Sequence, residues 1–217
     1  MKNPRLKLLQ ISARLFAKKS YGDVSVREIV SAAHMNVSAI KYHFGDKRSL
    51  FLETVKYLAQ KNHKLFAADQ KLAAALDQLD DLSRQQTLDL LHALLDKVID
   101  LGLDKRTLPL ERIFTHAALS ASKETLHLLF SFMDGFHTQP YKIISKLTGL
   151  PNKSPELVLI THIIFGQINF SECHRIVLLH DLGKKEYTPT LHQIIKNIVW
   201  KNTLTILNSY QRGSKLK

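Results

Sequence analysis

The hydrophobic positions of this chain repeat at helical spacing along most of its length. Apolar residues three or four positions apart form stripes that predict helices over residues 4–19, 26–33, 47–66, 83–102 and 188–207. A further helix is predicted from residue 154 to Cys173 or beyond, with Gly183 as its limit. No stretch alternates between apolar and polar residues with a period of two, so the pattern predicts no strands. We therefore expect an all-α protein with a small N-terminal group of helices and a larger helical body.

Capping residues mark where many of these helices begin. Asn3 before Pro4 is typical of the start of a helix, and Ser25 followed three residues later by Glu28 is a capping box. Three further capping residues start later helices: Ser83, Ser154 and Thr188. The remaining expectations are short helical pieces over 67–81, a loop over 104–108, a helix from Pro109, and helices over 122–135 and 141–147.

Residues 25–47 contain two short predicted helices joined by a tight turn. The first has one apolar face, made by Val26, Ile29, Val30 and Ala33. The turn is His34, Met35 and Asn36, and Asn36 is a favoured N-cap for the second helix.

The second helix of this pair has an outer face suited to DNA. Ile40 and Phe44 lie four positions apart and are expected to point inward. The other face carries small side chains followed by polar ones: Val37, Ser38, Ala39, Lys41, Tyr42 and His43. Small side chains let a helix approach base edges, and the polar ones reach phosphates, so this face favours a helix that lies in a DNA groove.

These residues resemble the helix-turn-helix of TetR-type transcriptional regulators. The run NVSAIKYHFGDK (residues 36–47) is most similar to the CecR-like subgroup of that family. The match covers about the first 55 residues, including the helix of Leu8, Ile11 and Phe16 and the Tyr21–Gly22 exit. One position departs from the family pattern, because His34 stands where the turn usually has Gly. Gly takes positive φ without strain, and His in that conformation costs on the order of 1 kcal/mol.

The resemblance implies roles for the candidate DNA-binding residues. Val37, Ser38 and Ala39 would face base edges, and Arg27 would contact guanine or phosphate. The residues implied to contact the DNA backbone are Lys41, Tyr42, His43 and Lys47. Each of two residues also has an interpretation without a role in DNA binding. Lys41 would then be a solvated surface lysine, and the ring of Tyr42 would pack on the surface of the domain.

The distribution of charge agrees with a nucleic-acid partner. The chain has a formal charge of +12, and residues 1–56 carry 11 Lys and Arg against 4 Asp and Glu. The remaining 161 residues carry 20 against 15, so positive charge is concentrated on the segment that has the motif. Without the motif, an inert basic surface would explain this charge equally well.

Other composition features restrict the compartment and the chemistry. A single cysteine, Cys173, excludes an intramolecular disulfide and fits a reducing compartment. We find no signal peptide and no apolar run of roughly 20 residues, so we expect a cytoplasmic protein without a membrane span. The 11 histidines do not occur at zinc-binding spacing, and no nucleophile or phosphate-loop motif is present. We therefore expect no metal, no cofactor and no catalysis.

The resemblance also implies how the body works. In TetR-type regulators the last two helices pair with those of a second subunit, and both helices here carry wide apolar stripes; alternatively, they close the monomer's own core. A small-molecule effector would bind among body helices. The candidate ligand-binding residues are Phe114, His116, Phe130, Met133, Phe136, Phe165 and Phe170. The alternative interpretation of each of these, taken separately, is an ordinary core residue, and that is the commoner role of such side chains.

The sequence thus predicts a DNA-binding domain at residues 1–55 and an effector-binding and dimerisation domain at 56–217. The predicted function is a repressor that binds a palindromic operator as a homodimer and is released by a ligand. Two alternatives stay open: a nonspecific DNA-binding helical protein, and an all-α enzyme or lipid carrier with an incidental basic head.

Overall fold

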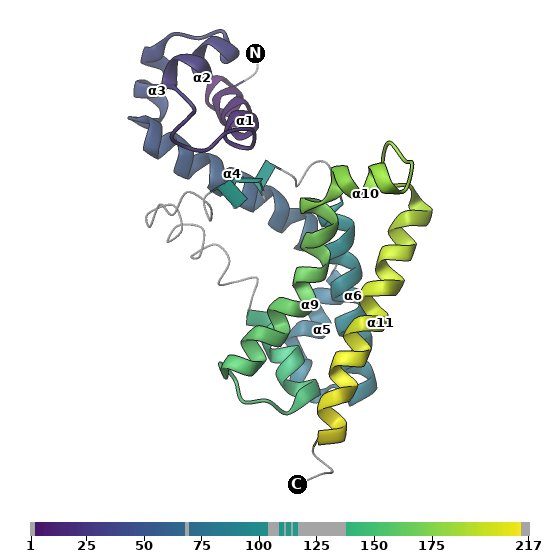
Figure 1. The fold of residues 1–217 in the computed structure, drawn as a ribbon. Helices are drawn as coiled ribbons and strands as arrows, with labels where there is room; N and C mark the ends of the chain where they lie inside the picture. The colour runs from purple at the N-terminus through teal and green to yellow at the C-terminus, as the bar shows by residue number, and fades with distance from the viewer. Residues whose placement is uncertain are drawn as a thin grey trace. The chain divides into compact units, whose positions relative to one another are not determined.

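The computed structural model describes residues 3–67, 70–103, 109–110, 112–113, 115–116 and 138–213 (Figure 1). All regular secondary structure in these ranges is helical, which confirms the predicted all-α class. The expected loop at 104–108 and the expected helix at 122–135 lie outside the described residues. The chain folds into two compact units, residues 1–65 with 105–134 and residues 66–104 with 135–217.

Within residues 3–67, the first unit has four helices around one core. They are α1 (Pro4–Phe16), α2 (Val26–Ala33), α3 (Val37–Phe44) and α4 (Lys47–Ala67), of which α4 continues past the limit of the unit. Leu8, Phe16, Ile29 and Leu50 are almost completely buried at its centre. Ile113 joins the same core from a distant part of the sequence.

Helix α1 is shorter than the sequence predicts. Asn3 caps it as expected, but the helix ends at Phe16 instead of near Lys19. The amides of Lys18 and Lys19 both donate to the carbonyl of Leu15, which closes the chain into a turn. The ring of Phe16 packs edge-on against Phe51 of α4, with centroids 4.9 Å apart, so the end of α1 is fixed in the core.

The capping box predicted at the start of α2 is only half formed. The Glu28 amide donates to Ser25 Oγ at 3.0 Å, as the pattern predicts. The Glu28 side chain does not return to the Ser25 amide and instead accepts a hydrogen bond from Lys19 Nζ at 2.7 Å. That bond lowers the pKa of Glu28, which burial alone would raise. The Lys19 ammonium therefore replaces the Ser25 amide as the partner of the Glu28 side chain.

The second unit contains the remaining described helices. They are α5 (Gln70–Asp77), the 3-10 helix η1 (Leu79–Asp81), α6 (Arg84–Gly102), a helix over 138–148, α9 (Pro155–Cys173), α10 (Arg175–Asp181) and α11 (Pro189–Gly213). Helices α9 and α11 run in opposite directions and both contact α6 (Figure 1). Leu91, Leu95, Ile144, Leu157 and Leu207 are among the residues buried in this core.

The predicted capping residues of this unit are confirmed. Ser83 and Gln86 form a complete capping box at the start of α6. Ser154 Oγ accepts from the Leu157 amide at 3.2 Å, and Thr188 Oγ1 accepts from the Leu191 amide at 3.2 Å. The helix expected from Ser154 ends at Cys173, the nearer of its two expected limits, and α10 begins after His174.

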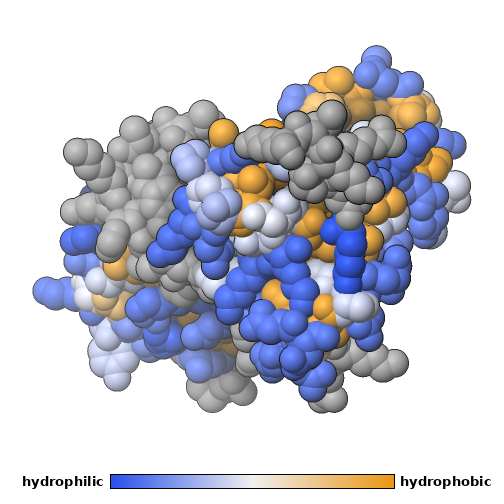
Figure 2. All heavy atoms as spheres, turned by 90° about the horizontal axis from the view of Figure 1, so that it is seen from below, coloured by the Kyte–Doolittle hydropathy of each residue, from blue (hydrophilic) through white to orange (hydrophobic). Residues whose placement is uncertain are grey.

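The stripes of α9 and α11 are only partly covered within the chain. Leu157, Ile164, Val199 and Leu207 are buried against the core. Large apolar side chains on the same two helices remain at the surface, namely Leu159, Ile163, Phe170, Ile194 and Ile198. Figure 2 shows hydrophobic residues open at the surface among hydrophilic ones. These two helices therefore carry an apolar face beyond the one that their own core uses.

Candidate nucleic-acid interface

The turn between α2 and α3 has the conformation that the motif requires. His34 lies in the left-handed region, with φ 53° and ψ 49°. The Met35 amide donates to the Val30 carbonyl at 2.8 Å and closes the end of α2. His34 therefore adopts the left-handed geometry for which glycine is usually selected.

Replacing His34 with glycine should stabilise the protein by about 0.5–1 kcal/mol. The left-handed conformation costs a non-glycine residue about 1 kcal/mol or more, and the greater freedom of unfolded glycine cancels part of the gain. Thermal denaturation measures this change. The matched control is Ala32→Gly, which places glycine at an exposed position inside α2 and should destabilise by about 1 kcal/mol. A lower melting temperature for His34→Gly would show that the imidazole itself stabilises the turn.

Asn36 fixes the beginning of α3. Its Oδ1 accepts from the Ala39 amide at 3.2 Å and from the Ser38 hydroxyl. The Ser38 hydroxyl hydrogen is thus directed at Asn36, and toward any outside group the oxygen is an acceptor. The sequence pattern predicts the cap but not this orientation of Ser38.

Helix α3 buries one face and exposes the other. Ile40 is buried in the core of the first unit, and Phe44 packs partly buried against it, as predicted. Val37 is 52% exposed and Tyr42 is 85% exposed, although both side chains have large apolar surfaces. The outer face of α3 therefore presents apolar surface as well as polar side chains to solvent.

The other candidate residues of α3 differ in how far they protrude. Ser38 and Lys41 are exposed. Ala39 is half-buried and packs against the core, so it offers less surface than the two residues before it. His43 is also half-buried, with its ring between Tyr42 at 4.9 Å and Phe44 at 6.2 Å.

Lys47, at the start of α4, is tied to the loop that follows α1. Its Nζ donates to the Tyr21 carbonyl at 2.6 Å and lies 4.3 Å from the centre of the Tyr21 ring. Burial lowers the pKa of Lys47, and the charge of Asp23 opposes that shift. The contact joins residues 26 positions apart, and no local pattern in the sequence predicts it.

The first turn of α4 is already capped by a carboxylate. Asp46 accepts from the Ser49 amide at 2.7 Å, which lowers the pKa of Asp46. The Ser49 amide is therefore already used and is not available to a phosphate at this helix start. Arg27, on the first turn of α2, is exposed and belongs to the same helix-turn-helix.

The candidate ligand-binding residues are only partly within the described ranges. Phe114, Phe130, Met133 and Phe136 lie outside them. His116 is half-buried, Phe165 is half-buried beside the core of the second unit, and Phe170 is 52% exposed and stacks on His174 at 4.5 Å.

The part of the chain that the structure describes contains neither a candidate metal site nor a candidate membrane-spanning helix. These residues contain no group of three or more His, Cys, Asp or Glu side chains able to hold a metal ion. None of the helices in the same ranges is long and apolar enough to cross a membrane.

A capped pair of short helices, a left-handed turn and an exposed outer face on the second helix define a helix-turn-helix DNA-binding domain. Residues 8–54 match the family model described as bacterial regulatory proteins, tetR family. The chain is 25% identical over 170 residues to the HTH-type transcriptional dual regulator CecR of Shigella flexneri, covering 77% of this chain and 76% of that protein.

Solved structures share the fold over nearly the whole chain. A transcriptional regulator of the TerR/AcrR family from Aquifex aeolicus VF5 has a TM-score of 0.55 and 19% identity, covering 94% of this chain and 99% of that one. AibR, solved in complex with isovaleryl coenzyme A and operator DNA, has a TM-score of 0.61 and 15% identity, covering 91% and 96%. Residues 8–54 therefore form a DNA-binding domain of the tetR family, and the predicted resemblance to TetR-type transcriptional regulators is confirmed.

Proposed function

We propose that this regulator is a repressor that binds a palindromic operator as a homodimer in the cytoplasm and leaves it when a small molecule binds. One observation supports the proposal that α3 binds the operator. On the outer face of this helix, Val37 and Tyr42 are exposed next to a buried Ile40. Residues 1–55 would be the DNA-binding domain and 56–217 the effector and dimerisation domain.

The residues of α3 suit a particular kind of base contact. Val37 can meet the methyl group of thymine, and Ser38 can accept from the amino group of adenine or cytosine. Neither side chain can make two hydrogen bonds to one base, so each would discriminate only modestly between base pairs. Ala39 is half-buried, so it would contribute little contact area, and its small side chain would let the helix approach the bases. Arg27 would supply the stronger contact, to guanine or phosphate.

Backbone contacts would come from the polar end of the motif. Lys41 and Tyr42 protrude from α3, and His43 lies beside them. Lys47 has three N–H donors, of which the Tyr21 carbonyl takes one. Together with Lys41, it would place positive charge against phosphates on either side of the groove.

The exposed apolar side chains of α9 and α11 support dimerisation. A two-fold dimer presents two copies of α3 to half-sites about one DNA turn apart, which is why the operator would be palindromic. Leu159 and Ile163 on α9, with Ile194 and Ile198 on α11, form the apolar surface that the partner would cover.

The effector is proposed by analogy with AibR, which was solved with isovaleryl coenzyme A and operator DNA. The candidate lining of the second domain is apolar and aromatic, and Phe165 lies half-buried beside its core. A ligand releases DNA only if it binds the DNA-free arrangement more tightly, so its affinity must differ between the two states.

Selection of bound sites from random DNA, at a stated salt concentration, tests the proposal. We expect a palindromic consensus bound by a dimer, with specific affinity at least about 1,000-fold above nonspecific affinity. Binding without any preferred site would instead support the nonspecific DNA-binding alternative. Weak binding that salt abolishes would support the enzyme or lipid carrier with an incidental basic head.

A further inference from the structure

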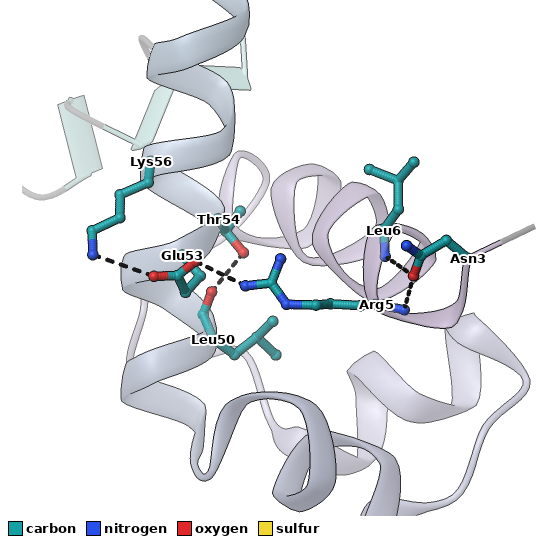
Figure 3. Close-up of polar contacts among 7 residues, drawn as sticks. All are labelled: Asn3, Arg5, Leu6, Leu50, Glu53, Thr54 and Lys56. Atoms are coloured by element: carbon teal, nitrogen blue, oxygen red, sulfur yellow. Dashed lines mark hydrogen bonds and ion pairs between the residues drawn. The ribbon is translucent and has the colours of Figure 1, made fainter.

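The side chain of Arg5 contacts two other helices of the DNA-binding domain. It leaves the first turn of α1, and its Nη2 lies 2.9 Å from Glu53 Oε2 on α4 (Figure 3). Its Cζ lies 5.0 Å from the centre of the ring of Phe44, the last residue of α3. A single guanidinium on α1 thus interacts with both α3 and α4 through its charge.

Both ends of Arg5 are fixed. At the backbone, Asn3 Oδ1 accepts from the Arg5 amide at 3.0 Å and from the Leu6 amide at 3.4 Å, as Figure 3 shows. This cap sets the point from which the side chain leaves α1. At the far end, the ion pair with Glu53 holds the guanidinium.

The turn of α4 that carries Glu53 is anchored in the core. Leu50 and Thr54 on the same helix are fully buried, and Thr54 Oγ1 donates to the Leu50 carbonyl at 2.7 Å. Glu53 also accepts from Lys56 Nζ at 3.2 Å. Burial raises the pKa of Glu53, but the hydrogen bonds from Lys56 and Arg5 outweigh it, so the pKa is lowered and the carboxylate stays charged near neutral pH.

Helix α3, in contrast, is held by few side chains. It has eight residues, and Ile40 is its one buried residue. Phe44 packs partly buried at its C-terminal end, and Gly45 then leaves the helix with φ 85°. The contact between the guanidinium and the Phe44 ring therefore acts where α3 has little other support.

We propose that Arg5 is a positioning residue for the DNA-reading helix: it holds the C-terminal turn of α3 by stacking on Phe44 while Glu53 fixes its guanidinium. This inference rests on the proposed function, since α3 is the helix taken to read the operator. Arg5 acts through Phe44 and not by contact with DNA.

Arg5→Lys tests the proposal in the full-length protein. Lysine keeps the charge and can still pair with Glu53, but it lacks the planar guanidinium. Losing the stack should speed hydrogen exchange of the amides in residues 41–44 about threefold to fivefold, with no change in α6. Affinity for the selected operator should fall by a similar factor, while affinity for nonspecific DNA and the salt slope stay unchanged.

Lys56→Ala is the matched control, because it removes the other cation on Glu53 without touching α3. It should leave exchange in residues 41–44 at the wild-type rate. Arg5→Lys in a Phe44→Leu background should have no further effect on exchange, because the ring is already absent.

Two outcomes would overturn the proposal. Unchanged exchange in residues 41–44 of both Arg5→Lys and Arg5→Ala would mean that the contact between Arg5 and Phe44 does not hold α3. Equal loss of affinity for all DNA in Arg5→Ala, with a salt slope smaller by about 1 per subunit, would mean that Arg5 binds phosphate directly. If the wild-type protein selects no operator, the proposed function fails, but the exchange measurement still decides the role of Arg5.

Discussion

Replacing Ile163 and Ile198 with glutamate should convert the regulator into a monomer and lower its affinity for a two-half-site operator at least about 100-fold. The loss reflects the second half-site, which no longer binds at the high effective concentration that a dimer provides. Both side chains are more than half exposed in the subunit, at 57% and 55%. Glutamate there should therefore leave the subunit folded, while pairing would bury an unpaired charge.

Sedimentation or light scattering measures the oligomeric state, and a gel shift measures the affinity. Ala93→Glu is the control, because Ala93 is exposed on α6 and lies outside the apolar face of α9 and α11. It adds the same kind of charge and should leave the dimer intact. A double variant that stays dimeric would place the subunit contact elsewhere on the chain.

The second large effect is expected from Tyr42→Phe combined with Lys47→Ala. Operator affinity should fall about 100-fold, because each hydrogen bond to phosphate that the two subunits no longer make is worth about 0.7 kcal/mol. Because phosphates carry no sequence information, affinity for nonspecific DNA should fall by the same factor. The slope of log affinity against log salt should become smaller by about 2, one unit for each lysine.

Lys47→Ala also removes the bond to the Tyr21 carbonyl, so thermal denaturation must accompany the binding assay. We expect a decrease of about 1 kcal/mol in stability, too small to unfold the domain. Lys61→Ala, an exposed lysine further along α4, is the control for charge alone and should change affinity little. A decrease in affinity confined to the operator would contradict the phosphate roles of Tyr42 and Lys47.

Features that depend on neighbours in the sequence were predicted well. The caps at Asn3, Asn36 and Ser154 need only a side chain and an amide two or three residues away, so the local pattern contains the whole interaction. The left-handed turn at His34 followed from the motif for the same reason.

Features that depend on distant residues were missed. Glu28 turned to Lys19, and Lys47 reached Tyr21, because folding brings other groups nearer than the local partners. The end of the helix that begins at residue 154 was left between Cys173 and Gly183, because apolar residues keep helical spacing through His174 and that spacing does not reveal the break between α9 and α10. The roles of individual residues in DNA or ligand binding stay predictions.

The apolar face of α9 and α11 has a genetic consequence if subunits pair through it. A copy with a disabled head, such as one lacking Tyr42 and Lys47, would still associate with intact copies. In a cell that makes equal amounts of both and pairs them at random, about three-quarters of the dimers would contain at least one defective head, and regulation would fail although half of the chains are normal. Such an allele would be dominant, and adding the glutamates at Ile163 and Ile198 to it should make it recessive.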